Sequence, residues 1–272
     1  MTIIQSIILG IIQGITEFVP ISSSGHLVLT PFVFGWQIPP AHSWVFNVLI
    51  QVGTLVAVII YFWRDLLNIA LAFLEGLQRR QPFATMQSRL GWYLILATIP
   101  ATFLGLVLKD AVEAAFDSPR ATAAFLLLTA ILLLLAERAG KRQNELADLT
   151  WKDALVIGCF QILALFPGVS RSGATITGGM LRNLDRPAAA RFSFLMSVPV
   201  MLGAGLLATI DLFQVPDLEA LLPTLAIGFL TSIVVGFVSI HWLLRFLARR
   251  PLYIFSVYCT LIGMVLLALT FR

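Results

Sequence analysis

The sequence predicts an all-α polytopic membrane protein built as an inverted repeat of two halves. Each half is expected to be a re-entrant helical hairpin followed by three transmembrane helices. Three observations lead to this fold class. Apolar residues make up 59% of the 272 residues and charged residues only 12%, about half of the charged fraction of a soluble domain. Several windows of about 20 residues are apolar and almost free of charge. A serine- and glycine-rich segment near the N-terminus recurs in the second half of the chain.

The formal net charge of +4 does not indicate a nucleic-acid-binding protein. The basic residues lie in short loops between apolar windows, where the positive-inside bias of membrane proteins places them. The first charged residue after Met1 is Glu17, and the next is Arg64. We therefore expect membrane lipids, and no nucleic acid, as partners.

Six apolar windows are long enough to cross a hydrocarbon core of about 30 Å. These windows are residues 44–63, 90–108, 120–136, 192–210, 220–244 and 252–271.

Two further apolar stretches, 3–18 and 153–166, are too short to cross. Each ends near a proline and enters a Ser/Gly loop, and at 1.5 Å per residue each reaches only about 21–24 Å. Apolar residues resume after the loops, at 27–35 and 174–181. A short helix, a polar tip and a second short helix predict a re-entrant hairpin, which a membrane tolerates only inside the protein or along a wet cavity.

The distribution of Lys and Arg predicts the orientation of the chain. Three or four basic residues lie in each of the loops 64–89, 137–152, 182–191 and 245–250, whereas loops 109–120 and 211–219 carry more acidic than basic residues. The positive-inside rule makes the first four loops cytoplasmic and the other two external. Six crossings then leave both termini external, and the two hairpins enter from opposite sides with their tips meeting near mid-membrane.

An internal repeat supports the same topology. Residues 10–25 and 158–173 align without a gap at an offset of 148, and we expect repeats of about 1–138 and 151–272 within one membrane domain. Each copy has three crossings, because a re-entrant hairpin returns to the side from which it enters. Three is an odd number, so the second copy starts on the opposite side of the membrane and is inverted, as in membrane folds with a central site. The identical pairs are Gly10/Gly158, Gln13/Gln161, Phe18/Phe166, Ser22/Ser170, Ser24/Ser172 and Gly25/Gly173.

The two tips carry the groups that chemistry would need. An ionisable side chain at membrane depth costs at least about 2.5–3.5 kcal/mol, so Glu17 and Arg171 are expected to have a partner and a function. Serine- and glycine-rich loops that lead into helices offer hydroxyls and free N–H groups to an anion. The planar guanidinium of Arg171 suits phosphate oxygens. The predicted phosphate-binding residues are Ser22, Ser24, Gly25, Ser170, Arg171, Ser172, Gly173 and Thr175.

The first tip has the residues for catalysis. Glu17 is expected to hold Mg²⁺ or Ca²⁺ with help from Gln13, four residues earlier on the same helix face. Ser23 is the predicted nucleophile, with His26 as its base and then acid. A metal-activated water in place of Ser23 stays open.

Structural readings of the same residues compete with the catalytic ones. Glu17 and Arg171 would also make a structural ion pair, and the serines would serve as helix caps. A histidine such as His26 is often a hydrogen-bonded core residue. Gln51, a polar residue within a span, would face the site or bond a neighbouring helix. The convergence of Glu, Ser, His and Arg at two opposed tips favours the catalytic reading.

The motifs at the two tips resemble those of the bacterial undecaprenyl-diphosphate phosphatase family, of the BacA/UppP type. One is Glu/Gln-x-x-x-Glu, here Gln13 to Glu17, and the other is Pro-Gly-x-Ser-Arg-Ser-x-x-Thr, here Pro167 to Thr175. The resemblance covers essentially the whole chain. At the first motif position this sequence has the neutral Gln13, so a second carboxylate for a metal is absent there.

This resemblance implies a hydrolase that converts undecaprenyl diphosphate to the monophosphate and inorganic phosphate. It also implies a divalent cation, a site at the outer (periplasmic) face of the bacterial cytoplasmic membrane, recycling of the lipid carrier for peptidoglycan synthesis, and bacitracin resistance. The sequence does not decide the oligomeric state, and a homo-oligomer is compatible with it.

The main alternative is a flippase or transporter of an anionic polyprenyl phosphate. Inverted repeats with broken helices are typical of alternating access, so the fold class alone does not separate the two functions. A flippase needs Arg171 and the helix termini but would tolerate loss of the Ser23 hydroxyl and of the His26 imidazole better than a hydrolase. A scaffold or channel subunit explains neither tip.

Overall fold

The structure, a computed structural model, describes residues 1–116, 118–212 and 218–270. These residues are predominantly α-helical and form no β-strand beyond an isolated bridge between Asn144 and Leu184. The helices are α1 (Ile3–Thr16), α2 (Ser23–Phe34), α3 (Pro40–Tyr61), α4 (Trp63–Gln78), α5 (Met86–Val107), α6 (Lys109–Phe116), α7 (Pro119–Ala139), α8 (Trp151–Leu163), α9 (Arg171–Leu181), α10 (Arg186–Leu212), α11 (Leu218–Leu247) and α12 (Tyr253–Thr270), with a short 3₁₀ helix at Leu146–Asp148.

Each of the six predicted windows lies largely within one long helix. Among the described residues, five helices are long and apolar enough to cross a membrane: α3, α5, α7, α11 and α12. The window 192–210 lies within α10, several of whose side chains fall outside the described ones. The protein is therefore a multi-pass membrane protein, and its sixth crossing stays a prediction.

Both hairpins have the predicted form of two short helices around a tip. α1 begins with a capping box, in which the Thr2 hydroxyl accepts from the Gln5 amide and the Gln5 side chain accepts from the Thr2 amide. α8 begins with the same device at Thr150 and Asp153. Such reciprocal caps satisfy two of the amides that a helix start leaves unpaired, so each hairpin has a well-defined start.

The structure adds two helices that the sequence had suggested only as loops. α4 occupies much of the predicted loop 64–89, and α6 lies in the predicted loop 109–120. α4 packs against α5 through buried residues such as Ile69 and Gly76 and leaves an apolar stripe exposed on another face. The stripe consists of Trp63, Leu67, Leu71, Leu74 and Leu77. The charged residues between these positions interrupt the apolar run, so the run is too short to predict a crossing even though its spacing is helical.

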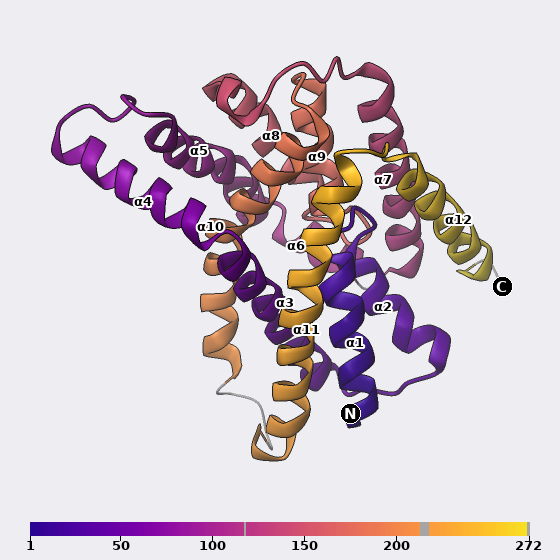
Figure 1. The fold of residues 1–272 in the computed structure, drawn as a ribbon. Helices are drawn as coiled ribbons and strands as arrows, with labels where there is room; N and C mark the ends of the chain where they lie inside the picture. The colour runs from indigo at the N-terminus through magenta and orange to yellow at the C-terminus, as the bar shows by residue number, and fades with distance from the viewer. Residues whose placement is uncertain (117, 213–217, 271–272) are drawn as a thin grey trace.

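Glycines bring the hairpins close to the long helices. α1 packs against α11, where a Cβ on Gly10 would lie 2.8 Å from the carbonyl oxygen of Gly228 (Figure 1). α8 packs against α5, and there a Cβ on Gly158 would collide with the carbonyl oxygen of Ala97. Small residues at such crossings let helix backbones approach closely in membrane proteins.

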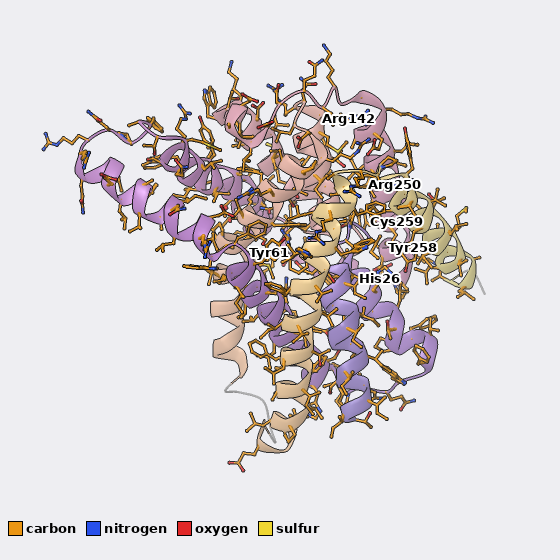
Figure 2. The ribbon with its side chains drawn as sticks, in the orientation of Figure 1. His26, Tyr61, Arg142, Arg250, Tyr258 and Cys259 are labelled. Atoms are coloured by element: carbon orange, nitrogen blue, oxygen red, sulfur yellow. The ribbon has the colours of Figure 1, made fainter. Side chains whose placement is uncertain are left out.

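A buried carboxylate joins three helix ends on one side of the molecule. Glu137, at the end of α7, accepts two bonds from Arg186 at 2.6 Å each and one from Arg142 at 2.8 Å. The amide of Leu252, next to α12, donates to the same carboxylate at 2.8 Å. Figure 2 shows Arg142 at this end of the ribbon, away from His26. These contacts join the C-terminal end of α7 to the N-terminal ends of α10 and α12.

Candidate active site

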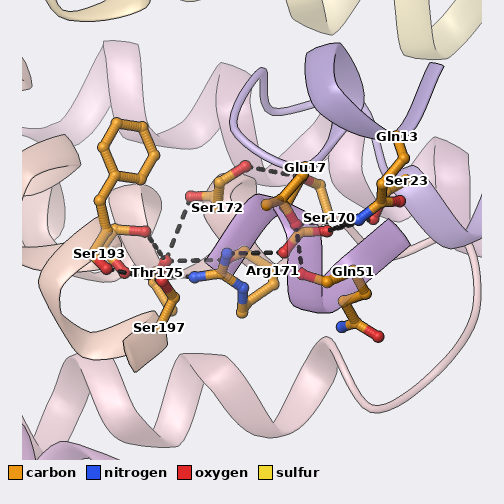
Figure 3. Close-up of polar contacts among 12 residues, drawn as sticks. Gln13, Glu17, Ser23, Gln51, Ser170, Arg171, Ser172, Thr175, Ser193 and Ser197 are labelled. Carbon is orange, nitrogen blue, oxygen red and sulfur yellow. Dashed lines mark hydrogen bonds and ion pairs between the residues drawn. The ribbon is translucent and has the colours of Figure 1, made fainter. Parts of the chain in front are cut away.

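The two hairpin tips meet through an ion pair between Glu17 and Arg171. The Nη2 atom of Arg171 lies 2.8 Å from Oε1 of Glu17, and the two side chains are only 14% and 4% exposed. Figure 3 shows the pair with polar side chains from both tips around it. The prediction that the tips come together is confirmed, although they lie 154 residues apart in the chain.

Helix α7 holds the second tip in place. The hydroxyl of Thr129 donates to the Gly168 carbonyl at 3.1 Å and accepts from the Ser170 amide at 2.9 Å. Gly168 has φ +98°, and a Cβ there would collide with the carbonyl oxygen of Thr122. Only glycine fits this turn, because it needs both the left-handed backbone and the close approach to α7.

The carboxylate of Glu17 is the centre of the site. Its Oε2 atom accepts from the Ser23 hydroxyl at 2.8 Å and from the Gln13 amide at 3.0 Å. Gln13 also donates to the hydroxyl of Thr54, on α3, at 3.4 Å. Glu17 thus gathers Gln13, Ser23 and Arg171 within hydrogen-bonding distance (Figure 3).

The structure does not bring Ser23 and His26 together. Nδ1 of His26 lies 2.7 Å from the Ser22 carbonyl oxygen, and its Nε2 lies 2.7 Å from the Tyr258 hydroxyl. Both ring nitrogens are therefore engaged elsewhere, and the acceptor next to the Ser23 hydroxyl is Glu17 rather than the predicted base.

The serines expected at the phosphate have local partners. Ser22 and Ser170 are the N-caps of α2 and α9, and their hydroxyls accept from the amides of Gly25 and Gly173 at 3.3 and 3.1 Å. The structural capping reading thus holds for these two serines. Their caps also direct the positive ends of two helices toward the Glu17–Arg171 pair, an arrangement that favours an anion.

The remaining predicted residues divide into two groups. The Ser24 hydroxyl lies 3.3 Å from that of Ser22, and the Ser172 hydroxyl lies 3.1 Å from that of Ser170, so both are at the tips. Thr175 is fully buried, and its hydroxyl lies 2.6 Å from that of Ser193, on α10. Thr175 therefore connects α9, which carries the second tip, to α10.

Comparison with known proteins identifies the family. Residues 6–265 match the family described as bacitracin resistance protein BacA. The chain belongs to the BacA family. Among its relatives are proteins named undecaprenyl-diphosphatase from Myxococcus xanthus, 42% identical over 99% of this chain and 89% of the relative, and from Chloroherpeton thalassium, 43% identical over 99% and 97%. A third, from Thermomicrobium roseum, is 44% identical over 98% of both chains.

In this BacA-family chain, four residues at the site escaped the sequence analysis. They are Thr54, Thr129, Ser193 and Tyr258. Each is an isolated polar residue within an apolar helix and belongs to no local motif. The only signal that could have found them is a polar side chain at a depth where an unpaired hydroxyl is costly.

The sequence allows two roles for Gln51, and the structure favours one. Its side chain is exposed although it lies within α3, and among the described residues it makes no hydrogen bond to another helix. Figure 3 shows Gln51 beside the polar residues of the candidate site. An interhelical hydrogen bond is therefore not what this side chain supplies.

The donor atoms at Glu17 are of the kind that a hard divalent cation uses. The described residues contain no group of three His, Cys, Asp or Glu that would hold a metal by themselves. The site has one carboxylate, an amide at Gln13 and several hydroxyls, all of which offer oxygen. Mg²⁺ sites often combine one or two carboxylates with water and substrate phosphate oxygens, so these residues fit a cation that arrives with a diphosphate.

Proposed function

We propose that this protein is an integral membrane phosphatase that hydrolyses undecaprenyl diphosphate to undecaprenyl phosphate and inorganic phosphate, which recycles the lipid carrier for peptidoglycan synthesis. The observation that carries the proposal is the naming of relatives 42–44% identical over almost the whole chain. The Glu17–Arg171–Ser23 cluster supports it. We place the protein in the bacterial cytoplasmic membrane with the site open to the periplasm, as the family resemblance implies, and with both termini external, as the basic loops predict.

Arg171 and the helix starts would bind the terminal phosphate. The guanidinium contacts Glu17 through Nη2 and the Ser193 carbonyl through Nη1 at 3.3 Å. A phosphate that replaces Glu17 as the partner of Arg171 would receive charge-assisted hydrogen bonds. It would also meet the positive ends of α2 and α9.

Ser23 and Glu17 provide a nucleophile and a base. As the Ser23 oxygen attacks the terminal phosphorus, its proton passes to Glu17, 2.8 Å away. The bond from phosphorus to the bridging oxygen breaks, and undecaprenyl phosphate leaves. Water then cleaves the phosphoserine and releases inorganic phosphate. In this assignment the base is Glu17 and not His26, the base that the sequence predicts.

A water molecule in place of Ser23 is the other route to the same products. Glu17 would then take the proton of the water directly, and Ser23 would only orient the carboxylate. An acid-quenched single turnover with substrate labelled in the terminal phosphate separates the two routes. A labelled Ser23 peptide is expected if the serine attacks, and label found only as inorganic phosphate would favour water.

We further propose that Mg²⁺ or Ca²⁺ binds at Glu17, with Gln13 as a second ligand. When bound, the cation would neutralise diphosphate charge and polarise the bond that breaks. Activity is expected to be lost in a chelator and restored by Mg²⁺ or Ca²⁺. Full turnover in excess chelator would contradict this role.

The flippase alternative is not favoured by the names of the relatives, and the residues allow a direct comparison. Phosphate release from undecaprenyl diphosphate in detergent with Mg²⁺ would be measured for the wild type and for Glu17→Ala, Ser23→Ala and Arg171→Ala. Release that collapses in all three variants supports hydrolysis at the meeting tips.

The matched controls come from an exposed ion pair. Glu75, in the last turn of α4, and Arg79, the residue that follows α4, lie 2.7 Å apart with side chains that are 56% and 73% exposed. Glu75→Ala and Arg79→Ala therefore remove the same charges away from the site. They should retain wild-type release. If well-folded wild type releases no phosphate, the hydrolase proposal fails, and transfer of labelled lipid in liposomes becomes the next test.

A further inference from the structure

We propose that Tyr258, on α12, is a positioning residue for the first tip: its hydroxyl and its ring hold the imidazole of His26 in place, and His26 in turn holds the turn at Ser22 that presents Ser23. The effect on catalysis rests on the proposed function, whereas the hydrogen bonding and the tautomer of His26 do not. The tips belong to two hairpins, and α12 is a separate helix more than 230 residues from the first of them along the chain.

The contact between Tyr258 and His26 is close and well oriented. The hydroxyl lies 2.7 Å from Nε2 of His26, and the two rings stack with centroids 5.7 Å apart and planes 12° apart. Figure 2 shows His26, Tyr258 and Cys259 close together beside α12. A hydrogen bond together with a stacked ring allows the imidazole little freedom to rotate.

The partners of His26 determine which nitrogen carries its proton. Nδ1 lies 2.7 Å from the Ser22 carbonyl oxygen, which can only accept a hydrogen bond, so Nδ1 must carry the hydrogen. In a neutral imidazole Nε2 then has a free lone pair, and the Tyr258 hydroxyl donates to it. The lone pair that would act as a base is therefore occupied by tyrosine and does not face Ser23.

His26 supports a backbone turn that is unfavourable by itself. Ser22 has φ +72°, in a region that costs a residue other than glycine about 1–3 kcal/mol. Its carbonyl oxygen accepts from Nδ1 of His26 and, at 3.3 Å, from the His26 amide. Ser23 is the next residue and donates to Glu17. A change in the ring position of His26 would therefore move the nucleophile relative to its base.

Helix α12 is a firm support for the Tyr258 hydroxyl. The Ser256 hydroxyl donates to the Ala130 carbonyl, on α7, at 2.7 Å. Cys259 is fully buried, and its thiol contacts the carbonyl oxygen of Pro20, in the first tip, at 3.8 Å. Tyr258 lies between these two residues in the chain, so the helix backbone that carries it is anchored to both α7 and the tip.

The kinetic test uses Tyr258→Phe, which removes only the hydroxyl. We expect kcat to fall by roughly 10- to 100-fold, the loss seen for residues that orient the ligands of a catalytic metal, with a much smaller change in KM. If Tyr258 acts through His26, the double variant with His26→Ala should be no slower than His26→Ala alone. Wild-type turnover in Tyr258→Phe, or multiplicative losses in the double variant, would overturn the proposal.

The chain provides a matched control for this variant. The Tyr61 hydroxyl lies 3.1 Å from Nδ1 of His241, a second tyrosine–histidine pair outside the tips. Tyr61→Phe removes the same atom from the same kind of pair and should leave kcat unchanged. An equal loss in both variants would indicate a general effect on packing and would overturn the assignment to His26.

A second measurement does not depend on hydrolysis. The chain has three histidines, so ¹⁵N-histidine NMR of the intact protein in detergent can be assigned with His42→Asn and His241→Asn. We expect His26 to carry its proton on Nδ1 in the wild type. Tyr258→Phe removes the donor to Nε2 and should move the ¹⁵N resonance of this nitrogen toward that of an imidazole nitrogen without a hydrogen bond, whereas Tyr61→Phe should leave it unchanged. A proton on Nε2 of His26 in the wild type would overturn the proposal. If the tautomer is as expected but the wild type hydrolyses nothing, it is the proposed function that fails.

Discussion

Glu17 shows how a single buried carboxylate can organise a site. It is 5% exposed and accepts from Gln13, Ser23 and Arg171, which come from both tips of the fold. A carboxylate buried without such donors would be strongly disfavoured. The same contacts that satisfy Glu17 place a hydroxyl and a guanidinium within reach of one phosphate, so stability and chemistry have a common origin here.

Arg171→Lys tests whether the guanidinium geometry matters beyond its charge. Lysine keeps the positive charge but loses the planar fork that contacts Glu17 and the Ser193 carbonyl together. Hydrogen bonds to charged groups contribute about 1.5–3 kcal/mol, so kcat/KM for phosphate release should fall about 10- to 100-fold. The control Arg79→Lys, at an exposed ion pair, should leave kcat/KM unchanged. A near wild-type kcat/KM in Arg171→Lys would contradict the need for two simultaneous contacts of the guanidinium.

Gln51→Leu separates a residue of the site from a contact between helices. Because the Gln51 amide is exposed and has no partner among the described residues, its loss should not lower the unfolding temperature in detergent. One hydrogen bond to substrate contributes about 0.5–1.5 kcal/mol, so KM should rise about 2- to 10-fold. A lower unfolding temperature with unchanged KM would restore the interhelical reading.

The residues of the tips could be found from the sequence, but their pairing could not. Glu17 and Arg171 were recognisable because charges are rare in apolar segments, and the repeat placed them opposite each other. The pairing of Ser23 with Glu17, and of His26 with Tyr258, depends on side-chain directions within a turn at φ +72°. No spacing in the sequence reveals that turn, because Ser22 is not a glycine.

At the scale of elements, apolar length predicted the helices well and failed where charges interrupt an amphipathic pattern. The long windows and the short hairpin helices were predictable because the length of an apolar run decides what crosses a bilayer. α4 was not, since its apolar stripe occupies only one face and charged residues such as Asp65 and Glu75 fall between. A search for helical periodicity within loops would have found it.

Asp153 links the two helices of the second hairpin at the end opposite the tip. This carboxylate, in the first turn of α8, lies 2.6 Å from Nε of Arg182, the residue after α9, and accepts from the Thr150 amide and hydroxyl. Burial raises the pKa of the Asp153 carboxyl, but the hydrogen bonds from Thr150 and Arg182 outweigh burial and hold the pKa below its ordinary value. The ion pair and the cap therefore stabilise the hairpin in the charged state.

Asp153→Asn should reveal this stabilisation as a function of pH. A carboxyl whose pKa is lowered by folding contributes stability that is complete above its unfolded pKa, about 3.9, and is lost as the pH falls through the folded value. We expect the variant to be less stable by about 1 kcal/mol near neutral pH, and the gap to shrink below about pH 4. Unfolding in detergent across this range, with the exposed Glu75→Gln as control, measures it. A difference in stability between the wild type and Asp153→Asn that does not change with pH would argue against a contribution from the charge of Asp153.

For the whole molecule, we propose that the two halves, about 1–138 and 151–272, are related by an inverted repeat. The packing supports this arrangement, because the first helix of each hairpin lies against a long helix of the other half. α1 crosses α11 at Gly10, and α8 crosses α5 at Gly158. These two glycines are also an identical pair in the sequence repeat. An exchange of this kind is what a pseudo-two-fold axis between the halves would produce.

The location of the C-terminus tests the inverted topology, because an even number of crossings with basic loops inside leaves both ends outside. A reporter that is active only outside the cytoplasm, fused after Arg272, should be active in cells. The same reporter inserted in the basic segment between α7 and α8, after Lys141, should be inactive. If the C-terminal fusion is inactive while the fusion in the basic segment is active, the orientation is reversed. If both are inactive, the number of crossings between Lys141 and the C-terminus is even rather than three, and the second half cannot be an inverted copy of the first.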